Sequence, residues 1–322
     1  SLAQSVPGGA FLCEKECFGK DDDMSRKHAP FIEHRYEKAE DLWLALSPAN
    51  QFRNGLENFV YRGQGDSTWP LVPTILRPRN HPPIISYNEM VDSTDMVFYE
   101  LSILARFVTH CDSVGISVPN DSQNFRKTVL STQTADRYYK EPSLWPNPEI
   151  LDLMAMAQHH GVPTRLLDWT TRAYTSAYFA ASSAVSRFDL WKAEDRLAIW
   201  ALDRVGLGIH EQIVLHHSPG SISRHLAAQG GLFTVHPHSG VRSGSFSVKG
   251  LEEMLNDIEY TPFLKLTLPV HESVGLLRLC SLAGFNAATI YPTADGAGRA
   301  VSDDMNMEGA HKKWNVDAIL VR

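Results

Sequence analysis

The sequence predicts an α+β domain, because strand-like and helix-like segments follow one another without the strict β-α-β alternation of a doubly wound sheet. Apolar residues make up 43% of the 322 residues, which is enough for a sizeable core. Residues 31–322 contain no convincing Pro/Gly linker, so we expect a single domain there. Residues 1–30 are rich in Gly, Pro and Asp without periodicity, which predicts a flexible tail.

The domain is expected to begin with a helix and a strand. Residues 37–47 have helical periodicity, whereas NFVYRGQGD at 58–66 is typical of a short strand that ends in a glycine-punctuated turn. Residues 69–83 contain too many prolines for regular structure. The predicted helix has a buried face made of Ala39, Leu42, Trp43 and Leu46.

A long helix is predicted next, over residues 87–109. The following residues, 112–146, are polar and lack a periodic apolar face, so we expect an irregular excursion there. The core-facing residues predicted for the helix are Phe98, Leu101, Leu104 and Ala105.

The central segment is predicted to form helix, turn, strand and helix. Asn147, followed by proline, starts the first helix, and Gly161 suits the position just past its end. Residues 164–168 are predicted to be a short buried strand. Thr170 is expected to cap a second helix over residues 171–184. The buried face of the first helix comprises Ile150, Leu151, Met154 and Ala157.

The remaining residues also mix strands and helices. In the strand 264–268, leucines alternate with Lys265 and Thr267, so we expect the leucines to face inward and these two residues outward. The predicted elements are strands at 197–203, 232–236, 264–268 and 287–292, and a helix at 271–284.

Charge and cysteine usage narrow the function classes. The net charge is −7, which does not favour global attraction to nucleic acid or to an anionic membrane. Four cysteines in a chain of this length do not form a disulfide scaffold, so we expect reduced thiols and a cytoplasmic protein. The sequence has no apolar run of membrane-spanning length and no secretion signal, so no membrane association is expected.

Residues 154–181, MAMAQHHGVPTRLLDWTTRAYTSAYFAA, place polar groups inside an apolar segment. His159 and His160 lie at a predicted helix C-terminus, where a cation is favoured, so the pair is either structural or part of a site. Arg165 and Asp168 lie three residues apart on a strand and therefore point to opposite faces. Asp168 precedes a helix start, so it either caps that helix or acts in a site.

The junction before the helix 171–184 suits an anion. Its first turn presents free backbone N–H groups and the positive end of the helix dipole. Arg62, at the end of its strand, is a natural second contact because arginine offers a bidentate fork to phosphate. Gly63 and Gly65 would let the backbone approach a ligand closely.

The sequence lacks the common nucleotide-binding, metalloprotease and serine-hydrolase motifs. The sequence has no G-x-G-x-x-G after a strand, no Walker A motif, no H-E-x-x-H and no G-x-S-x-G. His236 and His238 could join His159 or His160 around a metal, but no acidic residue has the spacing to complete the set. We therefore expect no metal.

The motifs resemble those of the FRG domain family of bacteria and phage. The resemblance rests on Phe59-Val60-Tyr61-Arg62-Gly63-Gln64 and on Gln158-His159-His160-Gly161-Val162-Pro163-Thr164-Arg165-Leu166-Leu167-Asp168-Trp169-Thr170. Two later pieces fit as well, Ala228 to Thr234 (AQGGLFT) and a closing segment from Gly284 to Gly296. In the closing segment Thr293-Ala294 replaces the usual D-L, which leaves Asp295 to carry any acidic role there.

A weaker resemblance links the chain to toxin-type ADP-ribosyltransferases. These enzymes carry an arginine on a first strand, a Ser or Thr where a later strand meets a helix, and a glutamate on a late strand. The counterparts here are Arg62 and Thr170, whereas Gln229 is the nearest candidate for the glutamate position. The resemblance implies a mixed fold of short strands in small sheets with flanking helices, and NAD as substrate.

The two resemblances imply an NAD-binding enzyme that transfers ADP-ribose or hydrolyses NAD, acting as a toxin or an anti-phage defence effector. The acceptor would be a protein or a nucleic acid. Alternatives are a non-catalytic module that senses a nucleotide or nucleic acid, and a nuclease or phosphodiesterase. The expected catalytic residues are Asp168, His160 and Gln229, and the expected NAD-binding residues are Arg62, Gly63, Gln64, His159, Arg165, Thr170 and Asp295.

Overall fold

The computed structural model describes residues 31–53, 58–77, 92–131, 136–207, 213–218, 229–238, 244, 246–254 and 263–316. The tail predicted at residues 1–30 lies outside these ranges, as do the first residues of the helix predicted at 87–109. Within the described residues, no helix has the length and apolar character needed to cross a membrane.

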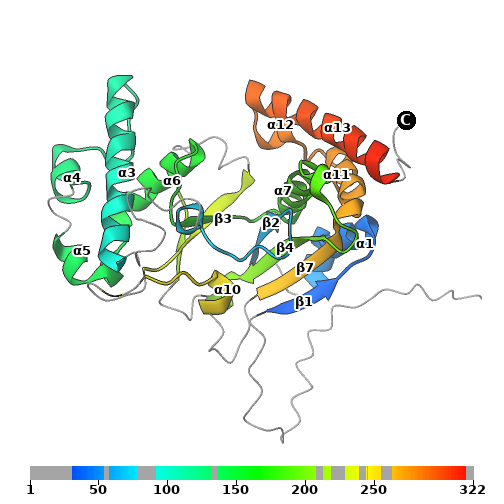
Figure 1. Ribbon diagram of the computed structural model, residues 1–322, viewed down its shortest axis with the longest axis horizontal. Helices are drawn as coiled ribbons and strands as arrows, with labels where there is room; N and C mark the ends of the chain where they lie inside the picture. Colours follow the sequence, from blue (N-terminus) through cyan, green and yellow to red (C-terminus); the bar gives the residue numbers. More distant parts are fainter. Residues whose placement is uncertain are drawn as a thin grey trace, which may run out of the picture.

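A seven-stranded mixed sheet forms the centre of the described chain (Figure 1). The strands β1 and β7 pair in parallel, and all other neighbours are antiparallel. The prediction of small sheets is therefore wrong, whereas the prediction of a mixed α and β fold is confirmed. In spatial order the strands are β1 (Ile32–Arg35), β7 (Phe263–Pro269), β4 (Arg196–Asp203), β2 (Phe59–Gln64), β3 (Leu166–Thr170), β6 (Gly231–Val235) and β5 (Val214–His216).

The helices gather in two groups. Figure 1 shows α3 to α6 at one end of the molecule and α1, α7, α11, α12 and α13 at the other. The first group comprises α3 (Ser93–Ser113), α4 (Gln123–Thr128), α5 (Asp136–Lys140) and α6 (Leu151–His159). The second comprises α1 (Ala39–Ala45), α7 (Ala173–Val185), α11 (Ser273–Leu282), α12 (Ala287–Ile290) and α13 (Ala294–Trp314). The described residues also form the short helices α2 (Pro48–Arg53), α8 (Arg204–Leu207) and α10 (Leu251–Met254).

The central strands are buried on both faces. In β4, Ile199 belongs to the cluster beneath α7 and α11, while Trp200 belongs to a cluster on the opposite face. This double coverage explains why the outward prediction for Thr267 on β7 is wrong, since its side chain has 0% exposure. The Thr267 hydroxyl is accommodated because it accepts a hydrogen bond from Nε of Arg196 at 3.1 Å.

Gly63 lets α7 lie directly on β2. A Cβ atom at this position would come within 2.1 Å of the carbonyl oxygen of Ser176 and 2.6 Å of the amide nitrogen of Ala180. The glycine is therefore needed for helix packing, which corrects the prediction that it opens the backbone to a ligand.

Replacing Gly63 with alanine is expected to destabilise the fold by about 1–3 kcal/mol, the usual cost of overpacking a core. Gly298 in α13 is a matched control, because its added Cβ would have nothing within 4 Å. Gly298→Ala should instead stabilise the protein by about 0.5–1 kcal/mol, as alanine does in a helix interior. Urea unfolding of both variants checks the prediction, and equal midpoints would contradict it.

Two predicted segments differ from the structure. Residues 112–146 contain α4 and α5, and their apolar residues Phe125 and Tyr138 are buried against α3 and α6, so this segment is not an irregular excursion. The strand predicted at 287–292 is not formed: residues 287–290 make the short helix α12, and Asn286 and Thr289 make a reciprocal capping box at its start. Phe98 of α3, predicted to face the core, is 46% exposed.

Candidate functional site

The antiparallel pairing of β2 with β3 brings Arg62 to Asp168. Nη1 of Arg62 donates to the backbone carbonyl of Asp168 at 2.9 Å and lies 3.6 Å from its carboxylate Oδ2. The two side chains differ in accessibility, with 15% of Arg62 and 60% of Asp168 exposed. The arrangement offers a reachable carboxylate beside a guanidinium that the fold holds in place.

Arg62 has unused hydrogen-bonding capacity. Its Nε is buried and has no hydrogen-bond partner among the residues that the structure describes, which is unusual for a buried donor. Burial lowers the pKa of Arg62, the Asp168 charge opposes that shift, and the charge of Arg77 adds to it. The group nevertheless stays protonated, because arginine is not deprotonated in proteins.

A second arginine, Arg77, comes from the proline-rich segment before α3. The backbone of this segment is tied to the β3 side of the sheet, because the amide of Ile75 donates to the carbonyl of Thr164 at 3.3 Å. Nε of Arg77 donates to the carbonyl of Val72 at 3.1 Å. Burial lowers the pKa of Arg77, and the charge of Asp168 opposes that shift. Asp168 thus lies in the field of two guanidinium groups.

Gln158, near the end of α6, is bonded directly to the carboxylate. Its Nε2 donates to Oδ1 of Asp168 at 2.6 Å, and its Oε1 accepts from the hydroxyl of Thr164. Gln158 was not among the predicted site residues, although its spacing before the glycine turn was the available signal.

The charge of Asp168 also acts on Tyr291, which belongs to the closing segment. Burial raises the pKa of Tyr291, the charge of Arg299 opposes this, and the charge of Asp168 adds to it. The guanidinium of Arg299 lies 4.8 Å from the centre of the Tyr291 ring. Arg62, Arg77, Gln158, Asp168 and Tyr291 are called the Asp168 site below.

Asp295, predicted as a ligand residue of the closing segment, is exposed in the first turn of α13. Its neighbour Gly296 is buried, and a Cβ there would come within 1.8 Å of the carbonyl of Tyr291. This close approach holds the start of α13 against Tyr291. The closing segment is therefore linked to Asp168 by the effect of that charge on Tyr291.

Arg165 does not contribute to this site. Its side chain has 0% exposure and each of its three nitrogens is bonded within the protein, so the prediction that it binds a ligand is wrong in this structure. Nε donates to Glu100 Oε2 at 2.7 Å, Nη2 pairs with Glu100 Oε1, and Nη1 donates to the carbonyl of His236 at 3.1 Å. Arg165 is the centre of a buried ionic network between α3 and β3.

Three further predicted site residues serve the fold. The amide of Gln64 is buried and accepts a hydrogen bond from Nε1 of Trp200 at 2.9 Å. Thr170 lies inside β3, where its hydroxyl donates to the carbonyl of Gln229 at 2.6 Å and accepts from the amide of Arg172 at 3.0 Å. The N-cap of α7 is Arg172, so Thr170 is not the cap itself. The half-buried Gln229 is held through its backbone.

His159 and His160 are exposed at the end of α6, where Gly161 adopts the left-handed conformation with φ of +84°. The His160 ring stacks near Phe107 of α3, with 6.4 Å between ring centroids. His159 and His160 therefore lie at the same helix end as Gln158, the residue that is bonded to Asp168.

His236 and His238 are both buried. Burial, reinforced by the charge of Arg165, lowers the pKa of each to about 4. Across the described part of the chain, no group of three or more His, Cys, Asp or Glu side chains is placed to hold a metal ion.

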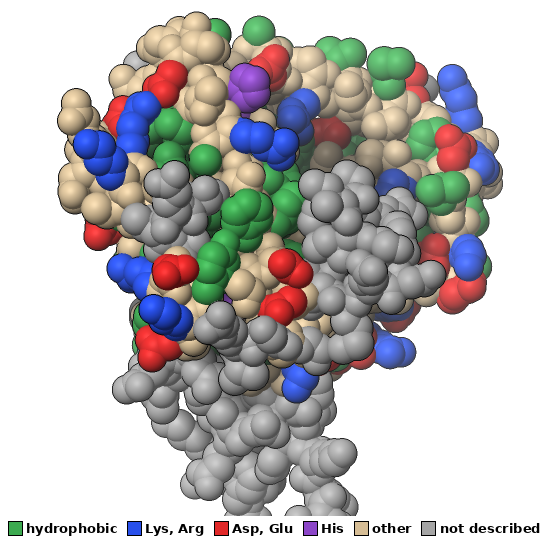
Figure 2. All heavy atoms as spheres, turned by 60° about the vertical axis from the view of Figure 1, so that its left-hand side comes forward, with side chains coloured by type: hydrophobic (Ala, Val, Ile, Leu, Met, Phe, Trp, Pro, Cys, Tyr) green, Lys and Arg blue, Asp and Glu red, His purple; other side chains and the backbone are tan. Residues whose placement is uncertain are grey.

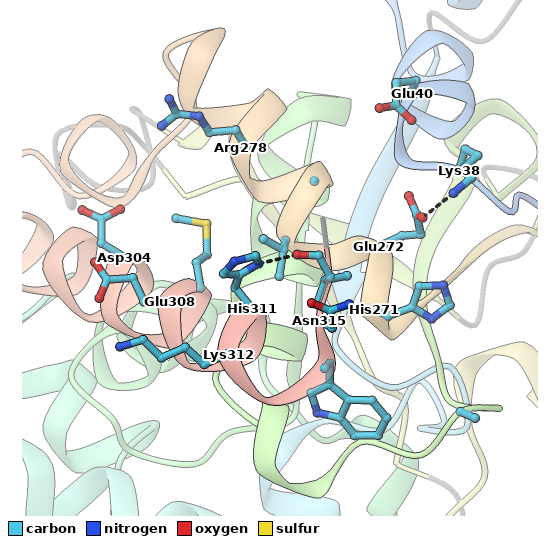
Figure 3. A pocket seen from close by; sticks show the side chains of 16 residues that line it. Lys38, Glu40, His271, Glu272, Arg278, Asp304, Glu308, His311, Lys312 and Asn315 are labelled. Carbon is cyan, nitrogen blue, oxygen red and sulfur yellow. Dashed lines mark hydrogen bonds and ion pairs between the residues drawn. The ribbon is translucent and has the colours of Figure 1, made fainter. Parts of the chain in front are cut away.

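A separate groove of about 1340 Å³ lies between α11, α13 and the residues before α1 (Figure 3). Acidic and basic side chains line it together, and Lys38 pairs with Glu272 at 3.1 Å across one end. No residue of the Asp168 site lines this groove. On the face that includes α3, acidic and basic side chains are interspersed (Figure 2), in keeping with the modest net charge.

The fold and the site define a mixed α and β protein whose polar site joins a Tyr-Arg-Gly strand to a neighbouring strand that carries a carboxylate. The model of the FRG domain family matches residues 57–187, a span that includes Arg62, Arg77, Gln158 and Asp168. No curated protein and no solved structure shows significant similarity to this chain.

Proposed function

We propose that the Asp168 site binds NAD and promotes cleavage of its bond between nicotinamide and ribose. The observation that carries the proposal is the pairing of Arg62 with Asp168, because it joins a cation with an unpartnered buried Nε to an accessible carboxylate. Arg77 adds a second positive charge nearby. Two guanidinium groups suit a pyrophosphate, and the carboxylate suits a ribose hydroxyl or a developing cation.

The chemistry assigned to the site is a substitution at the anomeric carbon of the nicotinamide ribose. The C–N bond breaks and nicotinamide leaves with the electron pair, so positive charge develops on the ribose. Water or an acceptor hydroxyl then forms the new C–O bond and gives up its proton. Asp168 would stabilise the developing positive charge and accept that proton as general base. Water as acceptor makes the reaction NAD hydrolysis, and a macromolecular acceptor makes it ADP-ribosyl transfer.

The similarity to ADP-ribosyltransferases supports this assignment through the order of elements. A Tyr-Arg-Gly strand, β2, pairs with β3, which carries Thr170 and is followed by α7 with its Ala177-Tyr178-Phe179-Ala180 segment. In our proposal Thr170 acts indirectly, by fixing the turn at Gln229. His160 and Gln229 are kept as candidates for contact with the ribose or the acceptor.

Replacing Arg62 with lysine tests the binding role. Lysine keeps the charge but loses the planar fork, so we expect the affinity for ADP-ribose to fall about ten- to a hundredfold, the value of one charge-assisted hydrogen bond. Isothermal titration calorimetry with ADP-ribose and NAD, together with an NAD-consumption assay, measures the effect.

Arg196→Lys is the matched control. Arg196 is 18% exposed, close to the 15% of Arg62, and it pairs with Glu37 at 3.2 Å on another part of the sheet. We expect this variant to bind ADP-ribose like the wild type. Binding without NAD consumption would favour the non-catalytic nucleotide-sensing alternative, and absence of binding at millimolar ligand would reject the proposed function.

A further inference from the structure

Gln158 joins Asp168 to the start of β3 through a chain of hydrogen bonds. The amide of Leu166 donates to Oγ1 of Thr164 at 3.2 Å, and the Thr164 hydroxyl donates to Oε1 of Gln158. Nε2 of Gln158 then donates to Oδ1 of Asp168 at 2.6 Å. Three residues of one motif thus bond to one another through their side chains.

The direction of this chain follows from its last member. An ionised carboxylate can only accept hydrogen bonds, so the Gln158 amide turns its NH2 group toward Asp168. Its carbonyl oxygen is then left for Thr164, whose hydroxyl donates to it while accepting from the backbone N–H of Leu166.

This chain of hydrogen bonds begins at a buried residue, Thr164, and ends at an exposed carboxylate, that of Asp168. Thr164 is buried with 2% exposure, and its carbonyl also accepts from the amide of Ile75. Asp168, in contrast, has a side chain that is 60% exposed and would otherwise rotate in solvent. The hydrogen bond from Gln158 occupies Oδ1, which leaves Oδ2 on the side of Arg62, 3.6 Å from its Nη1.

We propose that Gln158 is a positioning residue, fixed by Thr164, that holds the Asp168 carboxylate in one orientation so that Oδ2 faces the ligand beside Arg62. The inference rests on the proposed function, because positioning matters only if Asp168 acts on a bound ligand. It adds a residue pair to the site and assigns different tasks to the two carboxylate oxygens.

The first test needs neither ligand nor activity. In protein labelled with ¹⁵N-glutamine, the side-chain NH2 resonances of Gln158 are identified by their loss in Gln158→Met. We expect these resonances to shift in Thr164→Val, which removes the hydroxyl, and in Asp168→Asn, which removes the charged acceptor. Unmoved resonances in both variants would overturn the proposed hydrogen-bond chain.

The second test separates positioning from a merely structural role. Gln158→Met keeps the length of the side chain but cannot hold the carboxylate, so we expect kcat for NAD turnover to fall about ten- to a hundredfold, as misplaced groups do. KM should change by less than about twofold, because substrate binding is retained. An unchanged kcat would overturn the inference.

Gln51→Met is the matched control, because Gln51 also donates its amide within the protein, to the carbonyl of Leu46 at 2.9 Å, outside the Asp168 site. It should leave kcat, KM and the Gln158 resonances unchanged. If the wild type neither binds ADP-ribose nor consumes NAD, the proposed function fails. The resonance shifts then still decide whether Gln158 holds Asp168.

Discussion

Replacing Arg165 with leucine is expected to lower the free energy of unfolding by about 3–5 kcal/mol, the range measured when one partner of a buried ion pair is removed. The remaining partner, Glu100, has a side chain with 2% exposure. Within the described part of the chain it would keep the hydrogen bond from Nε1 of Trp145, at 3.0 Å, and would lose both contacts to the guanidinium. Urea unfolding followed by circular dichroism measures the loss.

The rest of the network explains why no other group can replace Arg165. His238 donates from Nε2 to the carbonyl of Ser93 at 2.8 Å, so its Nδ1 is the acceptor for Nη2 of Arg165 at 3.2 Å. The ring is therefore a neutral tautomer that needs a donor at Nδ1. Without Arg165, this nitrogen loses its donor and the carboxylate of Glu100 loses its charged partner, in a space closed to solvent.

Two further variants serve as controls for the prediction for Arg165→Leu. Arg126 binds Asp112 and Asp121 at 2.6 Å each, but on the surface, so Arg126→Leu should leave the urea midpoint close to that of the wild type. The double variant Glu100→Leu/Arg165→Leu should regain much of the lost stability, because no charge is then left buried alone. A midpoint for Arg165→Leu equal to that of Arg126→Leu would contradict the prediction.

Arg165 also illustrates what the sequence could not reveal about the site. Its partner Glu100 lies 65 residues earlier in the chain, on the opposite side of a predicted excursion. Local spacing correctly separated Arg165 from Asp168 onto different faces, since one side chain is buried and the other exposed. Which face of the strand packs into the core and which faces the Asp168 site depends on where α3 lies. The residues near Arg165 in the sequence do not predict the position of α3.

Arg77, in contrast to Arg165, belongs to the Asp168 site but could not be recognised as a site residue from its surrounding sequence. Its segment contains several prolines, which predict no regular structure. A single backbone hydrogen bond between Ile75 and Thr164 ties this segment to the start of β3. Such a contact between irregular segments depends on the tertiary fold and leaves no periodic pattern.

The strands were predictable where hydrophobic runs were long. The runs at β4, β6 and β7 were located within one or two residues, because buried strands carry continuous apolar residues. The strand β1 was missed, since its sequence IEHR is mostly polar and it is an edge strand bound only to β7. The helix α13 was missed because its composition is polar, with only Gly296 and Ala310 buried.

Asp168→Asn is expected to reduce NAD turnover by about a hundredfold or more while the fold keeps its stability. Asparagine preserves the shape and can still accept the hydrogen bond that Gln158 donates to Oδ1. The hydrogen bond from Arg62 goes to the backbone carbonyl and is unaffected. Only the negative charge is lost, and with it the general base and the stabilisation of positive charge on the ribose, which together give the expected factor.

The control for charge removal is Asp189→Asn. Asp189 is 70% exposed and pairs with Lys313 at 3.1 Å, so it matches the exposure and the cationic neighbour of Asp168 without belonging to the Asp168 site. NAD turnover, ADP-ribose affinity and thermal unfolding should be measured for both variants side by side. Asp189→Asn should match the wild type in all three.

The pattern of losses in Asp168→Asn identifies what the carboxylate does. A fall in turnover with unchanged ADP-ribose affinity means that the charge acts on the bond-breaking step. An interaction that stabilises the bound substrate and the transition state equally would change the affinity and KM instead. Helix capping is already a poor explanation, since the N-cap of α7 is Arg172 and the Asp168 carboxylate accepts from a side chain. Turnover equal to that of the wild type would remove Asp168 from the chemistry and leave His160 and Asp295 as the remaining predicted groups that could accept a proton.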